Sequence, residues 1–188
     1  MEPLLTSFIA AGLGEWGDAT QLLVVGLAAR FGRPGQILLG VALAAFATML
    51  IAAAGGILVH DGATLRAFSL LVGVVLLFAG AMGLVKAKPP PLADTVGGGP
   101  FLAAAMAFFI VGLGDRTQFI TFAIAARFDS LLLAALGATA GIVAANVPAA
   151  VLGPALLRQV PVKTIRLSAS ALFLLVGFYL SISALRLV

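Results

Sequence analysis

Long apolar stretches separated by short turns dominate this sequence. Each stretch has about 20 residues or more, which is enough for a helix to cross a bilayer. They cover residues 4–29, 36–59, 67–86, 101–126, 131–157 and 166–187. With 62% hydrophobic residues and a mean hydropathy of +1.20, the chain has too little polar surface to coat a soluble domain. The sequence therefore predicts an all-α integral membrane protein with six transmembrane helices.

The longest break between these stretches, from Lys86 to Pro100, divides the chain near its middle. It contains Pro-Pro-Pro and Gly-Gly-Gly, a composition typical of a linker and not of a folded unit. We therefore expect a first three-helix repeat at residues 1–88, a linker at 89–100 and a second three-helix repeat at 101–188.

The two halves share one motif at an offset of 97 residues. "GEWGDATQLLVVGLAARF" at 14–31 and "VGLGDRTQFITFAIAARF" at 111–128 have eight identical residues in this register. Because each half has three spans, the second half must enter the membrane from the opposite side. We therefore expect two inverted repeats, an architecture in which transporters place the substrate site near the midplane between the repeats.

Basic residues are distributed unevenly between the two sets of turns. The first, third and fifth turns contain Arg30, Arg33, Lys86, Lys88, Arg158, Lys163 and Arg166. The opposite side contains Arg66, Arg127 and Arg186. Because basic residues accumulate in cytoplasmic loops, we expect a cytoplasmic linker and both termini outside the cytoplasm. The compact chain without long loops favours a multi-pass protein of a bacterial inner membrane.

Three acidic residues lie near the centres of the first and fourth stretches: Glu15, Asp18 and Asp115. An ionised carboxylate at that depth costs several kcal/mol unless it is paired, hydrated or protonated. In a continuous helix Glu15 and Asp18 share a face, with Gln21 at its edge, and Asp115 repeats this spacing with Gln118. Converging carboxylate and amide oxygens are ligands for hard divalent cations such as Mn²⁺, Ca²⁺ or Mg²⁺.

Other polar residues near the acids have two interpretations each. Thr20 and Thr117 either add hydroxyl ligands or bond back to their own helices. Asn146 lies two residues before Pro148, which removes a backbone donor and can free a carbonyl near Asn146. Asn146 therefore either supports the site or bonds to another helix. For the motif glycines, such as Gly17 and Gly114, we favour close helix packing over local unwinding.

The repeated motif resembles Glu-x-Gly-Asp-basic-Thr, found once in each half of the cation/proton antiporter family that includes the Golgi calcium/manganese transporter and bacterial manganese exporters. The resemblance rests on "EWGDATQ" and "GLGDRTQ". It implies exchange of Mn²⁺ or Ca²⁺ for protons, with Glu15, Asp18 and Asp115 binding the cation. By the same resemblance Gln21 and Gln118 join them.

The sequence departs from that motif twice. Ala19 stands at the basic position of the first copy, and Gly112 stands at the leading acid of the second. Three acids and Arg116 still give the set a net charge of −2, which one divalent cation or two protons neutralise. Gly112 lies four residues before Arg116, where the motif has an acid that would be its neighbour on the helix. Because that partner is missing, we expect Arg116 to pair with Glu15 across the repeat axis.

Export of Mn²⁺ in exchange for H⁺ is the function that these features favour. A Ca²⁺/H⁺ antiporter is one alternative, and a non-transporting membrane scaffold derived from the same family is another. The sequence contains no nucleotide fingerprint, phosphate loop or nucleophile triad. We therefore expect no enzymatic activity and no bound cofactor. The expected partners are the divalent metal ion, protons and the lipid bilayer, and not nucleic acid.

Overall fold

The computed structural model describes residues 1–62, 64–91, 93 and 96–185, and this part of the chain is helical without strands. The long helices are α1 (Glu2–Glu15), α2 (Ala19–Phe31), α3 (Pro34–Leu58), α4 (Leu65–Leu84), α6 (Pro100–Gly112), α7 (Arg116–Phe128), α8 (Leu131–Leu152) and α10 (Val162–Leu185). Short helical turns are η1 (His60–Gly62), η2 (Gly153–Ala155) and α9 (Leu156–Gln159). The prediction of an all-α protein is confirmed.

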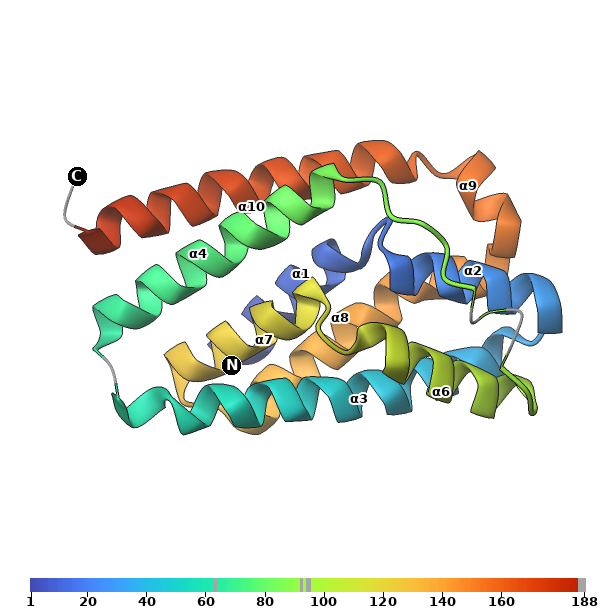
Figure 1. Cartoon of the computed structure of the whole chain (residues 1–188), viewed down its shortest axis with the longest axis horizontal. Helices are drawn as coiled ribbons and strands as arrows, with labels where there is room; N and C mark the ends of the chain where they lie inside the picture. The colour runs from blue at the N-terminus through green and yellow to red at the C-terminus, as the bar shows by residue number, and fades with distance from the viewer. Residues whose placement is uncertain (63, 92, 94–95, 186–188) are drawn as a thin grey trace.

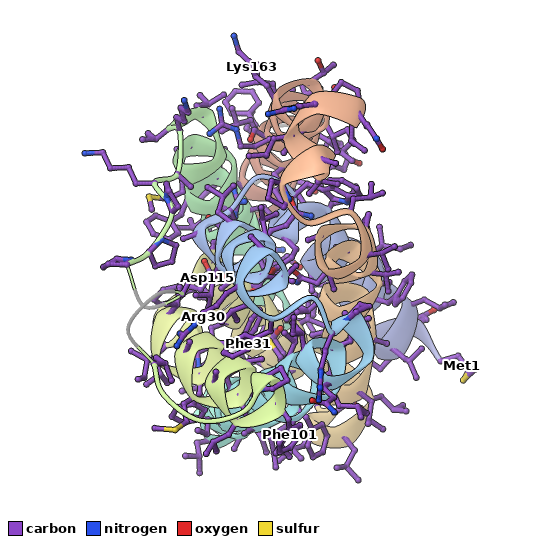
Figure 2. The ribbon with its side chains drawn as sticks, turned by 90° about the vertical axis from the view of Figure 1, so that its right-hand side faces the viewer. Met1, Arg30, Phe31, Phe101, Asp115 and Lys163 are labelled. Carbon is purple, nitrogen blue, oxygen red and sulfur yellow. The ribbon has the colours of Figure 1, made fainter. Side chains whose placement is uncertain are left out.

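The connections between the helices gather at the two ends of the bundle (Figure 1). The turn between α2 and α3 and the short helix α9 lie at one end, and the segment after α4 leads from the middle of the bundle toward that end. Figure 2 looks onto this end, where Arg30, Phe31 and Lys163 are labelled. The connections from α3 to α4 and from α7 to α8 lie at the other end, together with the end of α10.

Four segments are long and apolar enough to cross a membrane by themselves: α3, α4, the segment from α8 through α9, and α10. Helices α6 and α7 together form a fifth candidate that bends by 71° at its break. Many of the large apolar side chains on these helices are exposed on the bundle surface, where lipid is their natural solvent. The chain is therefore a multi-pass membrane protein with four to five candidate spans.

The expected continuous helices at 4–29 and 101–126 are wrong, because each is broken at the acidic motif. The first break separates α1 from α2 at residues 16–18, and the second separates α6 from α7 at residues 113–115. Gly17 has φ +67° and Gly114 has φ +78°. This left-handed conformation favours glycine, so these glycines unwind the chain instead of serving only for close packing.

Each break is stabilised by the glutamine that follows it. Asp18 and Asp115 are the extended N-cap residues of α2 and α7, and the glutamines occupy the third helical position. Gln21 Oε1 accepts a hydrogen bond from the Gly17 N–H at 2.9 Å, and Gln118 Oε1 accepts one from the Gly114 N–H at 2.7 Å. The glutamine side chains thus accept hydrogen bonds from backbone N–H groups just before each helix, which would otherwise be unpaired.

Helices of one half pack closely on helices of the other half: α1 on α8, α3 on α6 and α4 on α10. Gly40 of α3 lies against the Phe101 carbonyl of α6, and Gly137 of α8 lies against the Leu4 carbonyl of α1. At the offset of 97 residues, Gly137 corresponds to Gly40, and Phe101 corresponds to Leu4. The two contacts are therefore equivalent. The absence of a side chain at these glycines lets the backbones approach closely.

Gly40→Ala and Gly137→Ala are each expected to lower the thermal stability of the detergent-purified protein. An added methyl group would collide with the facing backbone carbonyl, which is not free to move aside. Overpacking of this kind typically costs about 1–3 kcal/mol. Gly35→Ala is the matched control on α3, since nothing lies within 4 Å of its added carbon. An unchanged melting temperature for both test variants would contradict these close contacts.

Two further expectations about the turns need correction. The fifth stretch does not run as one helix to residue 157, because α8 ends at Leu152 and Gly153 takes φ +52°. The sixth helix begins at Val162, so Arg166 lies inside α10, where it is buried, and not in a turn. Arg186 and the end of the expected 166–187 helix lie outside the described residues.

The linker is held against the first half of the chain. Arg30 near the end of α2 donates from Nη1 to the carbonyl oxygens of Ala93 and Val96, at 3.0 and 2.8 Å. Ala93 is buried and faces Gly26 of α2. Ala93 and Val96 of the linker are therefore held against α2 at this end of the bundle.

Candidate functional site

The two helix breaks meet at one cavity of about 240 Å³. Asp18 from the first break and Asp115 from the second both line it, with Arg116 beside them. The remaining lining residues are Ala19, Phe78, Met82, Val85, Lys86, Ala87, Lys88 and Gly114. A larger groove of about 320 Å³ between α3 and α6 has only apolar lining residues, so it offers no ligand to a cation.

Arg116 is paired with Asp18. The expected pairing of Arg116 with Glu15 is therefore wrong. Arg116 Nε lies 3.4 Å from Asp18 Oδ2, and only 6% and 17% of the two side chains are exposed. The two atoms make no hydrogen bond with each other, so the contact is an ion pair without good directional geometry. The earlier expectation assumed a continuous helix, and the break moves Asp18 into the position facing Arg116.

Asp115 has a different partner. Its Oδ2 accepts a hydrogen bond of 2.8 Å from the Thr117 hydroxyl, two residues further along α7. Thr117 therefore supports an acid of the cavity, whereas its counterpart Thr20 has no hydrogen bond at its buried hydroxyl. The two copies of the motif have the same backbone plan but different side-chain bonding.

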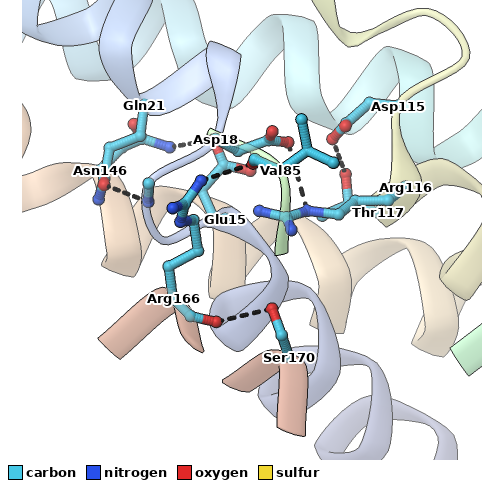
Figure 3. A network of polar contacts seen from close by, with 11 residues as sticks. Glu15, Asp18, Gln21, Val85, Asp115, Arg116, Thr117, Asn146, Arg166 and Ser170 are labelled. Atoms are coloured by element: carbon cyan, nitrogen blue, oxygen red, sulfur yellow. Dashed lines mark hydrogen bonds and ion pairs between the residues drawn. The ribbon is translucent and has the colours of Figure 1, made fainter. Parts of the chain in front are cut away.

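Glu15 lies apart from the cavity lining and is completely buried at the end of α1. Asn146 of α8 donates from Nδ2 to Glu15 Oε1 at 2.9 Å (Figure 3). This contact is an interhelical hydrogen bond to a predicted site residue, so it agrees with both interpretations of Asn146. Among the described residues, no three carboxylate, histidine or cysteine side chains form a metal-binding cluster. In this conformation the three acids do not share one ion position.

The predicted ligands Gln21 and Gln118 are engaged with backbone groups. Besides accepting from the glycines, Gln21 donates to the Ala145 carbonyl at 2.9 Å, and Gln118 donates to the Thr48 carbonyl at 3.2 Å. The acceptors belong to α8 and α3, which occupy the same place in opposite halves of the chain. Both glutamines thus tie a motif break to the other half, and their role as ligands stays a prediction.

Arg166 lies near the site, although the sequence predicted that it would lie in a turn. Its Nη1 donates to the Val85 carbonyl at 2.5 Å, and its side-chain stem packs beside Gly17 (Figure 3). Val85 lines the cavity, so Arg166 connects α10 to both the first break and the cavity wall. The apolar pattern around Arg166 starts at Val162, which was the available signal for a helical position.

The arrangement suits a small hard cation. Asp18 and Asp115 offer carboxylate oxygens at one cavity, Glu15 lies deeper, and Arg116 brings the net charge of the set to −2. Such oxygens bind Mg²⁺, Ca²⁺ or Mn²⁺, and a proton can occupy the same atoms. Arg116 competes with a cation for Asp18, because both positive charges favour the same carboxylate.

Comparison with known proteins agrees with this chemistry. The sequence pattern of the divalent cation/proton antiporter GDT1 matches residues 3–90 and, separately, residues 100–187. A protein of Vibrio cholerae serotype O1 named "Putative manganese exporter" is 33% identical over 178 residues, covering 94% of this chain and 89% of that protein. No solved structure matches the chain. Proteins of this kind are transporters and not enzymes, and this chain belongs to the GDT1 family of divalent cation/proton antiporters.

Proposed function

We propose that this protein exports Mn²⁺ from the cytoplasm in exchange for protons, with Asp18 and Asp115 as the first carboxylates to bind the cation. The observation that carries the proposal is that one aspartate from each half lines the same cavity, with Arg116 as a neighbouring counter-charge. The name of the Vibrio cholerae relative supports manganese as the cation. The family supports protons as the exchanged ion.

The proposal includes six spans arranged as two inverted repeats. Support comes from pairs of contacts related by the offset of 97 residues. Gln21 donates to Ala145 and its counterpart Gln118 donates to Thr48, which is the counterpart of Ala145. The two matches to the family pattern, one in each half, support the same division of the chain. Counting α1–α2 and α6–α7 as one broken span each gives six.

In the proposed orientation the cavity faces the cytoplasm. It extends to Lys86 and Lys88, which begin the segment that leads from α4 toward the end of the bundle with most of the basic turns. Basic residues favour the cytoplasmic side. The conformation described here is then the one that receives a cation from the cytoplasm, and exchange requires a second conformation that opens the acids to the other side.

Cysteine labelling tests this orientation, because the chain has no cysteine of its own. In intact cells a membrane-impermeant maleimide is expected to label Val59→Cys but not Lys88→Cys. Both positions are exposed. Val59 directly follows α3 at one end of the bundle, and Lys88 belongs to the segment that leads from α4 toward the other end. Both variants should react after the cells are opened. Labelling of Lys88→Cys alone in intact cells would reverse the orientation.

Transport itself is tested in proteoliposomes that contain the purified protein and an imposed pH gradient. The expected result is Mn²⁺ accumulation against its gradient, together with dissipation of the pH gradient by counter-moving protons. Ca²⁺ and Mg²⁺ in parallel vesicles determine cation preference, which oxygen ligands alone do not fix. Vesicles that behave like protein-free controls with all three cations would contradict the proposal.

A further inference from the structure

Three buried oxygen atoms near the first motif have no hydrogen-bond partner: Glu15 Oε2, Thr20 Oγ1 and Asn146 Oδ1. The exposed fractions of these residues are 0%, 1% and 0%. They come from three different helices, α1, α2 and α8. A buried polar atom without a partner costs about 1–3 kcal/mol, and native structures contain few of them. Three in one place indicate that something else satisfies them.

Contacts hold these groups around the Glu15 carboxyl. Asn146 Nδ2 donates to Glu15 Oε1 at 2.9 Å and to the Ile142 carbonyl at 3.0 Å. Since both acceptors require an N–H donor, the orientation of the amide is fixed and Oδ1 must be the free atom. The Thr20 hydroxyl also lies close enough to the Glu15 carboxyl to interact with it, although the two atoms do not reach regular hydrogen-bond geometry.

The chemistry of the free atoms identifies the class of ligand. A carboxylate oxygen and an amide oxygen only accept, and a hydroxyl can coordinate through its oxygen. The carboxylate and amide oxygens would therefore repel an anion or a neutral acceptor. A cation that prefers oxygen ligands, such as Mn²⁺, Ca²⁺ or Mg²⁺, satisfies all three atoms together.

We propose that Glu15, Thr20 and Asn146 form an occluded position for the transported divalent cation, behind the cavity that Asp18 and Asp115 line. The proposal rests on the proposed function and adds to it a second position and a ligand outside the repeated motif, Asn146. The cation passes from the cavity carboxylates to this deeper position. There, protein oxygens replace its remaining water.

The second half of the chain lacks the equivalent position. At the offset of 97 residues, Gly112 stands for Glu15 and Met49 stands for Asn146. Thr117, which stands for Thr20, is already bonded to Asp115. The occluded position therefore occurs only in the first half, and the two copies of the motif have different roles.

Two substitutions that remove a ligand test the position. Mn²⁺ binding to the full-length protein in detergent is measured by electron paramagnetic resonance of the free ion. Asn146→Leu and Thr20→Val are each expected to weaken Mn²⁺ affinity about tenfold to a hundredfold, as losses around metal sites do. Thr139→Val on α8 is the matched control, because its hydroxyl bonds only to the Ala135 carbonyl of its own helix, and it should bind Mn²⁺ normally. Thr20→Val keeps the side-chain shape and carries the test alone if Asn146→Leu does not fold.

Asn146→Asp separates a cation site from a purely structural network. This substitution places a second carboxylate beside Glu15 and removes the amide donor. The metal-free variant should melt at a lower temperature than the wild type, and Mn²⁺ should raise its melting temperature more than it raises that of the wild type. A structural network predicts the loss of stability without the larger rescue, and that result would overturn the proposal.

Failure of this position and failure of the proposed function give different results. Suppose that Asn146→Leu and Thr20→Val bind Mn²⁺ with wild-type affinity while Asp18→Asn abolishes exchange. This result overturns the occluded position, but it leaves the proposed exchange function intact. Wild-type exchange by Asp18→Asn overturns the proposed function itself.

Discussion

Asp18→Asn and Asp115→Asn should each reduce Mn²⁺/H⁺ exchange in proteoliposomes more than about a hundredfold, since each removes a charged ligand and not merely a supporting group. Each substitution deletes the group on which cation and proton compete. Neither aspartate side chain makes a capping hydrogen bond, and asparagine is equally favoured at this position, so the starts of α2 and α7 should persist.

The two variants should differ in stability. Asp18→Asn leaves the buried Arg116 without its counter-charge, so the metal-free protein should unfold at a lower temperature. Asp115→Asn keeps that ion pair and should be affected less. Asp129→Asn is the matched control, because this residue caps α7 at the bundle surface and 61% of its side chain is exposed. Wild-type exchange by either motif variant would contradict the assignment of these acids.

Arg116→Gln is expected to destabilise the metal-free protein and to raise its Mn²⁺ affinity. The destabilisation arises because Asp18 loses its buried counter-charge, and breaking a buried pair typically costs about 3–5 kcal/mol. The gain in affinity arises because the guanidinium no longer competes for the same carboxylate. Thermal unfolding with and without Mn²⁺ measures both effects. Arg158→Gln on the exposed helix α9 is the control for loss of one positive charge.

A double-mutant cycle identifies the partner of Arg116. Arg116→Gln combined with Asp18→Asn should be markedly more stable than the sum of the single effects predicts, because neither charge then remains unpaired. The same cycle with Glu15→Gln should give a smaller coupling, since Glu15 is bonded to Asn146. Equal coupling in both cycles would contradict the ion pair described here.

The sequence was sufficient to predict the class of fold and to single out two acids, Asp18 and Asp115, that line the cavity. Apolar stretches of spanning length predicted an all-helical membrane protein, and the eight identities between the halves singled out Asp18 and Asp115. These signals are strong because lipid demands helices with few charges. A charge that occurs twice in such surroundings is therefore conspicuous. The resemblance to the cation/proton antiporters is confirmed by the family match.

The helix breaks were missed because apolar residues continue on both sides of them. The signal was present in Gly-Asp-x-Thr-Gln, which places an N-cap acid three residues before a glutamine. Once the helix is broken, spacing along an ideal helix no longer tells which side chains face each other. For that reason the sequence paired Arg116 with Glu15, whereas the structure pairs it with Asp18.

The sequence could also not predict hydrogen-bond partners that are distant along the chain. Asn146 was a candidate because a buried amide beside a proline is unusual, but its contact with Glu15 depends on how α8 packs against α1. The hydrogen bonds of Gln21 and Gln118 end on backbone carbonyls, which carry no residue signature. Such contacts become visible only when the helices are placed in three dimensions.

The central claim is that the carboxylates of this chain exchange a divalent cation for protons, and proton release on metal binding tests it most directly. The purified protein in weakly buffered detergent solution is mixed with Mn²⁺ while a pH indicator is followed. The account predicts release of protons from the wild type, weaker Mn²⁺ binding as the pH is lowered from about 8 to about 5, and no release from the double variant Asp18→Asn with Asp115→Asn. Mn²⁺ binding that releases no protons and has the same affinity across this pH range would contradict it.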